Sequence, residues 1–342
     1  MNKSQSTFDP VNIINGGEYC IWYLFIYNCQ HSSYFVAVFY SNFIASVITT
    51  LFSGILLSHR LNKRKTPLFV EGLLSPLEGF LLFTFIGGIS RMLCSIIFLS
   101  DIEPRNYILR QTVEDWTWLN IQLSVATYLA GVFRTIPRIT IIQPTNESDQ
   151  PQTSLWIPSI GFIRCAYWSF FVFLIVICQG SSITSGYFRM QSNKRLSDIF
   201  LSIRLLCYTF GCTSMFFGYG IYGRTLVKLT KRSFELIDEN ERNNERFKWQ
   251  LRKMQMFNQA ACSNFLFWSI ATFFVAFWHD LVWSTFVLSG IQILMAHPIN
   301  LMSYIVGLIV IAMSDSKSQG LDPNDISMTF SNQYMQSQSA PS

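Results

Sequence analysis

The fold is decided by stretches such as Leu77–Ser100, LEGFLLFTFIGGISRMLCSIIFLS, which carries only Glu78 and Arg91 as charged side chains. A helix needs about 20 mostly apolar residues to cross the hydrocarbon core of a bilayer, which is about 30 Å thick. This stretch is long enough, and its apolar residues do not alternate as they would in a strand. It therefore predicts a membrane-spanning helix.

Similar runs recur along the chain. Of the 342 residues, 50% are hydrophobic and 13% are charged, whereas soluble domains carry roughly 25% charged residues. This composition argues against an ordinary soluble enzyme and predicts an all-α polytopic membrane protein with a seven-helix, receptor-like bundle. The seven expected spans are approximately Tyr34–Ser58, Leu77–Ser100, Trp116–Phe133, Ile157–Gln179, Ile199–Tyr222, Phe257–Trp278 and a last helix that ends at Met313.

The last apolar stretch, Leu281–Met313, is too long for one simple span and contains His297 and Pro298. Proline is best tolerated in the first turn of a helix. We therefore expect the seventh helix to begin near His297 and Ser284–Ala296 to form an apolar connection that lies in the membrane. One long kinked helix is the alternative.

The N-terminal run Tyr19–Cys29 is too short to span a bilayer and is rich in Trp and Tyr, which favour the interface between water and lipid. We expect it to lie at the membrane surface, packed over the first helix. No basic region and no small-residue cleavage site mark it as a secretory signal. Cys20 and Cys29 are the two cysteines that could pair, provided that this end is luminal or extracellular.

The basic residues predict the orientation, because cytosolic loops are enriched in Lys and Arg. The loops after the first, third and fifth spans and the C-terminal tail hold 16 of the 25, whereas the N-terminal segment and the other loops hold six. We therefore expect an outer or luminal segment 1–33, a seven-helix domain 34–313 and a disordered cytosolic tail 314–342. The expected compartment is an endomembrane, vacuolar or lysosomal, or the plasma membrane.

Three arginines fall inside spans, where an unpaired charge is costly. Arg91 follows two glycines that allow a close approach of another helix. At 1.5 Å per residue, Arg91 lies about 20 Å above Glu78, at a level close to that of Asn300 and Tyr304. We expect the carbonyl of Asn300 or the hydroxyl of Tyr304 to hold Arg91; hydrogen bonds to backbone carbonyls are the alternative. Two further arginines are expected to extend toward water from near the span ends: Arg164 and Arg204.

The segment Gly223–Gln259 mixes basic, acidic and apolar residues and predicts two amphipathic helices that extend the fifth and sixth spans into the cytosol. We expect them to bind a cytosolic partner; binding of anionic membrane lipids by their basic residues is the alternative. The expected partner surface comprises Arg134, Arg138, Leu236, Ile237 and Trp249.

Sites for chemistry are scarce, so we expect no enzyme, no metal and no cofactor. The eight cysteines lack metal-ligand spacing. Adjacent helix residues point about 100° apart, so His279 and Asp280 do not by themselves form a metal site. The basic residues do not follow one face, which argues against nucleic-acid binding. A small-solute transporter or channel remains the alternative function, although no internal repeat supports it.

Three stretches carry a family resemblance: Phe85–Phe98, Thr127–Phe133 and His297–Tyr304. They resemble corresponding segments of the tobamovirus multiplication protein family of seven-helix, receptor-like membrane proteins. The resemblance implies an endomembrane location and a scaffold or receptor role that involves small GTPases, and it implies no catalytic residues. We expect signalling or scaffolding with a cytosolic G protein or small GTPase as the partner. Arg134 departs from the acidic residue expected there, and the basic patch after the last helix is reduced to Lys317.

Overall fold

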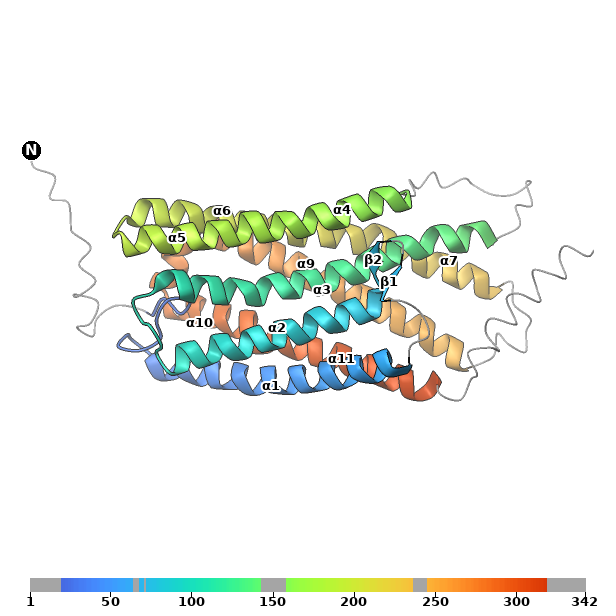
Figure 1. Cartoon of the computed structure of the whole chain (residues 1–342), viewed down its shortest axis with the longest axis horizontal. Coiled ribbons are helices and arrows are strands. Elements are labelled where there is room, and N and C mark those ends of the chain that lie inside the picture. The colour runs from blue at the N-terminus through green and yellow to red at the C-terminus, as the bar shows by residue number, and fades with distance from the viewer. Residues whose placement is uncertain (1–19, 64–67, 71, 143–157, 236–244, 319–342) are drawn as a thin grey trace, which may run out of the picture.

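The computed structural model describes residues 20–63, 68–70, 72–142, 158–235 and 245–318, and these form a long bundle of nearly parallel and antiparallel helices (Figure 1). The elements in chain order are α1 (Ser32–Lys63), β1 (Phe69–Val70), β2 (Leu73–Leu74), α2 (Pro76–Leu99), α3 (Tyr107–Ile142), α4 (Ile160–Phe173), α5 (Gly180–Met190), α6 (Lys194–Gly218), α7 (Arg224–Glu235), α9 (Glu245–Ser284), α10 (Phe286–Leu294) and α11 (Asn300–Ser318).

Several of these helices join end to end through π-helical turns. Leu174–Gln179 connects α4 to α5, Tyr219–Gly223 connects α6 to α7, and Met295–Ile299 connects α10 to α11. The antiparallel pair β1 and β2 forms a hairpin between α1 and α2, in which Phe69 pairs with Leu74. The all-α, polytopic expectation is therefore confirmed.

Six helical segments are long and apolar enough to cross a membrane: Ser32–Asn62, Pro76–Leu99, Ile160–Met190, Lys194–Lys228, Asn258–Ser284 and Phe286–Ile309. They correspond to six of the seven expected spans. The expected span Trp116–Phe133 lies within α3, which is not among the six. A count of seven crossings is therefore not shown by length and composition.

Helix α3 is less apolar than the six candidate spans because it carries several polar side chains, and these are turned inward. Gln111, Glu114, Asp115, Asn120 and Gln122 are all buried. The helix packs against α2, α4, α5, α6 and α7, and it runs along the middle of the bundle (Figure 1). Neighbouring helices, rather than lipid, surround these side chains.

The last span begins earlier than expected. Helix α9 ends at Ser284, Thr285 is extended, and α10 begins at Phe286. The expectation that the seventh helix starts near His297 after a connection Ser284–Ala296 is therefore wrong. Pro298 does not start a helix; it lies inside the π-helical turn Met295–Ile299. The wider π turn accommodates the proline ring and its missing N–H, which would break a regular helix at this point.

Close helix packing depends on glycines at a few positions. A Cβ on Gly88 would lie 2.4 Å from Thr50 Oγ1 of α1, and one on Gly186 would lie 2.7 Å from the Cα of Ile108 in α3. The expectation that Gly88 permits a close approach is thus met, but the approaching helix is α1. At Gly186 the contact is with backbone, so side-chain rotation cannot relieve it.

Helices α3, α7 and α9 extend beyond the rest of the bundle at one end (Figure 1). Helix α9 contains 40 residues, which corresponds to about 60 Å at 1.5 Å per residue. The expected helical extensions of the fifth and sixth spans are therefore present as α7 and the first part of α9. The polar turn expected at Asp238–Asn244, between these two helices, lies outside the described residues. Helix α11 continues through Ser318 into the segment expected to be disordered.

Candidate functional site

Residues 20–29, here called the N-terminal plug, form a loop closed by a disulfide bond between Cys20 and Cys29. Trp22, Tyr23 and Ile26 are buried in the bundle, with exposed fractions of 4% or less. The expected disulfide is therefore present. The aromatic side chains insert between helices, in one core cluster with residues of α1, and bury their apolar area there. The position of the plug relative to the membrane surface stays a prediction.

Arg110, in the first turns of α3, holds the plug. Its guanidinium donates a hydrogen bond to the carbonyl of Leu24 at 2.6 Å, and it also donates to Asp101 Oδ1 at 2.6 Å and to the carbonyl of Ile102 at 3.2 Å. The Arg110 side chain is fully buried. Arg110 precedes the expected span Trp116–Phe133 in the sequence, so this role was not predicted.

Aromatic residues of the plug meet the last helices. Trp22 Nε1 donates to Gln292 Oε1 at 3.4 Å, and the ring centroid of Tyr23 lies 4.8 Å from that of Trp283. Burial raises the pKa of Tyr23 to about 12. The phenol is therefore protonated at neutral pH and remains a hydrogen-bond donor.

Beneath the plug lies a buried charge cluster made of Arg204, Glu114 and Asp115. Arg204 Nη1 lies 3.7 Å from Glu114 Oε2 and 3.7 Å from Asp115 Oδ1. It also donates a hydrogen bond to Ser182 Oγ at 3.0 Å. The expectation that Arg204 extends to water is wrong, because two carboxylates of α3 attract it into the bundle.

The two carboxylates have further donors. Tyr208 donates to Asp115 Oδ1 at 2.6 Å, and Trp118 Nε1 donates to Glu114 Oε1 at 2.6 Å. The first hydrogen bond connects α6 with α3, the second lies within α3, and both satisfy part of the desolvated charge. Glu114 and Asp115 stand just before the expected span Trp116–Phe133, and no spacing in the sequence links them to Arg204. Their pairing with Arg204 was therefore not predicted.

Arg91 is also fully buried and contacts the expected helix through different atoms. Its Nη1 lies 3.2 Å from the carbonyls of both Ala296 and His297. These carbonyls belong to the π-helical turn, about one turn before the expected partner Asn300 and about two turns before Tyr304. Both of those residues are buried. The observed hydrogen bonds therefore agree with the alternative expectation, in which Arg91 donates to backbone carbonyls. The Arg91 guanidinium lies 5.9 Å from the ring centroid of Trp118.

A cavity of about 60 Å³ lies between the plug and the charge cluster. Its wall includes Glu114 and Arg204, so the charged groups border open space. Four tryptophans and two tyrosines also line it: Trp22, Trp118, Trp268, Trp283, Tyr23 and Tyr208. Mostly apolar walls with a few polar groups are typical of small-molecule sites, but this cavity is much smaller than the roughly 300 Å³ at which such sites begin.

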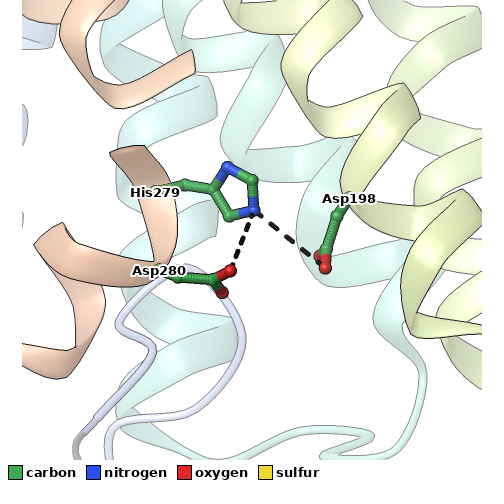
Figure 2. A group of neighbouring side chains, drawn as sticks. All are labelled: Asp198, His279 and Asp280. Atoms are coloured by element: carbon green, nitrogen blue, oxygen red, sulfur yellow. Dashed lines mark ion pairs between the residues drawn. The ribbon is translucent and has the colours of Figure 1, made fainter. Parts of the chain in front are cut away.

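A second polar group lies at the ends of α6 and α9 on the side of the plug. His279 Nε2 is 4.0 Å from Asp198 Oδ2 and 3.9 Å from Asp280 Oδ2 (Figure 2). The backbone of α9 is non-helical at Trp278, so the regular 100° separation expected for adjacent helix residues does not fix where His279 and Asp280 point.

This second group has the ligand types of a metal site, because three donor atoms lie within 4.8 Å of one another. Each carboxylate, however, already has a cation. Asp198 Oδ1 lies 3.2 Å from Arg189 Nη2, and Asp280 Oδ1 lies 3.5 Å from Lys194 Nζ. Ion pairing between α5, α6 and α9 accounts for the arrangement.

The expected partner surface is only partly described. Arg134 is half-buried near the far end of α3, and Arg138 follows it in the same helix. Trp249 lies in α9, whereas Leu236 and Ile237 fall outside the described residues; the side chains of Arg138 and Trp249 are also outside them. Arg164 is exposed at the start of α4.

Comparison with family models, curated proteins and solved structures finds no match for this chain.

Proposed function

We propose that the chain is a receptor-like protein of seven membrane helices that signals to, or holds, cytosolic partners. In this proposal α3 is the remaining crossing. With 36 residues it extends about 54 Å, which exceeds the bilayer core of about 30 Å. Its acidic and amide side chains are buried among other helices, where they avoid lipid.

The observation that carries the proposal is the difference between the two ends of the bundle. One end has a cavity capped by the N-terminal plug. At the other end α9 begins at Glu245, 13 residues before the apolar segment Asn258–Ser284, and therefore extends about 20 Å beyond it. A receptor needs a ligand site on one side of the membrane and a docking surface for its partner on the other. The cavity and the projecting helices lie at opposite ends of the bundle, as such signalling requires.

The proposed orientation places the plug outside or in a lumen and the C-terminus in the cytosol. The 16 to 6 distribution of basic residues supports it, and so does the disulfide, because disulfides persist in oxidising compartments. An endomembrane, vacuolar or lysosomal, is the compartment favoured by the family resemblance, with the plasma membrane as the other candidate.

The proposed partner is a G protein or small GTPase that docks on the projecting ends of α3, α7 and α9. Exposed basic residues are present there: Arg224, Lys228, Lys231 and Arg252. These cations suit an acidic protein surface, and they also suit anionic lipid heads. An experiment must therefore separate protein docking from lipid binding.

Proximity labelling from a biotin ligase fused to the C-terminus tests the partner. We expect labelled GTP-binding proteins, and we expect Lys228→Glu with Lys231→Glu to reduce that labelling several-fold. Arg105→Glu with Arg195→Glu, at exposed positions of the plug end, is the matched control and should change nothing. Equal labelling in both variants would contradict the docking surface. If the labelling of GTP-binding proteins instead depends on the anionic lipid content of the membrane, lipid binding is favoured.

Protease protection of tags at both ends tests the orientation. We expect the N-terminal tag to be protected in sealed vesicles that display the cytosolic face, and the C-terminal tag to be digested. A protected C-terminal tag would reverse the assignment.

A transporter is the second candidate, and the buried acids beside the cavity favour it, because intramembrane carboxylates occur in proton relays. Proton flux into vesicles that contain the purified protein separates the two functions. A flux that Glu114→Gln abolishes would favour transport. Its absence in vesicles with correctly folded protein would favour the receptor.

A further inference from the structure

The group of Asp198, His279 and Asp280, at the ends of α6 and α9, directs three ligand atoms at one point. His279 Nε2 lies 4.0 Å from Asp198 Oδ2 and 3.9 Å from Asp280 Oδ2, and one ligand atom of each residue lies within 4.8 Å of the other two. Figure 2 shows the imidazole facing both carboxylates. The adjacent pair on α9 is thus joined by a third side chain from another helix.

The ion pairs of this group use the other oxygen of each carboxylate. Arg189 contacts Asp198 through Oδ1, and Lys194 contacts Asp280 through Oδ1. These pairs account for where the carboxylates lie, and they leave both Oδ2 atoms directed at His279. In metal sites a ligating carboxylate usually has its other oxygen held by a hydrogen-bond donor, which is the position of Arg189.

The atoms that converge are all acceptors unless the imidazole is protonated. Neither nitrogen of His279 makes a hydrogen bond in the part of the chain that the structure describes: Nδ1 is buried without a partner, and Nε2 has only the two long contacts to carboxylates. Carboxylates accept and do not donate, and a neutral imidazole has one lone-pair nitrogen. Either a proton on Nε2 or a metal ion is therefore needed to join the three.

The distances favour a metal ion. A hydrogen bond from a protonated Nε2 would bring nitrogen and oxygen to about 2.7 to 3.2 Å, which is shorter than the 3.9 and 4.0 Å observed. Two ligands on one tetrahedral Zn²⁺, at bond lengths of about 2.0 to 2.2 Å, lie about 3.3 to 3.6 Å apart. Rotation of Asp280, whose side chain is 72% exposed, closes the remaining gaps.

The surroundings give an ion access and leave it a free coordination position. The group borders an open groove whose lining belongs to α6 and α9. The pair of Lys194 and Asp280 is exposed, so it contributes little and a metal ion can displace the ammonium. One imidazole nitrogen and two carboxylate oxygens are a ligand set that Zn²⁺ accepts, with water in the fourth position, whereas Ca²⁺ and Mg²⁺ prefer oxygen ligands alone.

We propose that Asp198, His279 and Asp280 bind a Zn²⁺ ion that clamps α6 to α9 at the plug end of the bundle. The site goes beyond the proposed receptor function and does not depend on it. The ring of His279 lies 5.1 Å from that of Trp283, which in turn lies 4.8 Å from the ring of Tyr23. The ion is therefore separated from the plug by a single aromatic side chain, Trp283.

Zinc binding to the purified full chain in nanodiscs, without a histidine tag, tests the proposal. The measurement is competition with a coloured zinc chelator at about pH 8, where protons compete weakly for an ordinary imidazole. We expect about one zinc ion per chain, and at least about ten-fold weaker binding in His279→Gln. His31→Gln, exposed at the same end, is the matched control and should bind as the natural protein does. Absence of zinc binding, or equal affinity in the two variants, would overturn the proposal and leave His279 to a proton.

Three further variants separate a ligand from a merely structural residue. Asp280→Asn should weaken zinc binding at least about ten-fold and Asp280→His should restore it, because imidazole is a zinc ligand. Glu103→Gln removes an exposed acid of the plug end and should change nothing. Lys194→Gln should strengthen zinc binding several-fold, since the ammonium no longer competes for Asp280. Weaker binding in Lys194→Gln, or no recovery in Asp280→His, would contradict the site.

The melting temperature provides an independent measurement of the clamp. Zinc should raise the melting temperature of the natural protein, because an ion that binds only the folded chain stabilises it. It should not raise that of His279→Gln, and without zinc the two proteins should melt as cooperatively as each other. A zinc-dependent rise of equal size in both would place the ion elsewhere and overturn the proposal.

Discussion

Arg110 and Leu24 are joined by a hydrogen bond of 2.6 Å, in which the guanidinium of α3 donates to a main-chain carbonyl of the plug. The same side chain reaches Asp101 in the loop between α2 and α3. One buried cation therefore fixes the plug, that loop and the start of α3 relative to one another.

Replacing Arg110 with Leu should strongly destabilise the protein, because Asp101 loses its partner and the carbonyls of Leu24 and Ile102 lose theirs. We expect a loss of about 3 to 5 kcal/mol, measured as the free energy of unfolding in mixed detergent micelles. Arg105→Leu, at an exposed position nearby, should change this free energy by less than about 0.5 kcal/mol. A small effect of Arg110→Leu would show that the plug is held by its apolar residues.

Replacing Arg204 with Met should leave Glu114 and Asp115 buried without their common cation. We expect a loss of about 3 to 5 kcal/mol in unfolding free energy. Adding Glu114→Gln and Asp115→Asn should restore part of it, because the amides carry no charge to desolvate. If the triple variant is no more stable than Arg204→Met, the charge cluster is not the cause. Arg195→Met, at an exposed position, is the control.

Removing the disulfide with Cys20→Ser and Cys29→Ser should loosen the plug. We expect a loss of about 2 to 4 kcal/mol, since the crosslink restricts the unfolded chain. A reductant should lower the melting temperature of the natural protein but not that of the double variant. The remaining cysteines of the described chain are free. Reductant sensitivity that persists in the double variant would therefore show that the Cys20–Cys29 disulfide is not its cause.

Gly186→Ala should separate α5 from α3, because the new Cβ would lie within 3.0 Å of three backbone atoms of Tyr107 and Ile108. We expect a loss of about 1 to 3 kcal/mol. Gly307→Ala, where nothing lies within 4 Å, should instead stabilise the helix by up to about 1 kcal/mol. Unfolding of the two variants measured side by side gives the comparison, and equal effects would contradict a backbone contact at Gly186.

Much of the fold could be predicted from local composition. Apolar runs such as Leu77–Ser100 are required of any helix that faces lipid, and six of them correspond to candidate spans. Helix α3 is harder to recognise because its inward face carries acids and amides, so it lacks the composition that marks a span. The seventh helix was predicted to begin too late. The residues around Pro298 do not show whether the proline lies at the start of a helix or inside a π-helical turn.

The candidate site was less predictable, because its pairs join distant segments. Arg204 and Glu114 are 90 residues apart in the chain, and no local pattern states that they meet. Arg91 was assigned to the correct partner helix by its depth, but its acceptors are backbone carbonyls, which every residue has. Trp22 and Tyr23 lie in an aromatic-rich segment. Such a composition is equally compatible with a segment at the membrane interface and with a lid buried in the bundle.

The π-helical turn at Met295–Ile299 also bears on the length of the last span. A π turn contains one residue more than the α-helical turn it replaces, so the helix before it and the helix after it keep their facing directions. A chain shortened by one residue within this turn could still present Ser289 and Ile293 above it and Leu301 and Leu308 below it to the bundle. The carbonyl of His297 accepts from the backbone N–H of Asn300 and from Arg91 Nη1, so both of its lone pairs are used. The π turn thus offers main-chain oxygens to a guanidinium without any carboxylate having to be placed there.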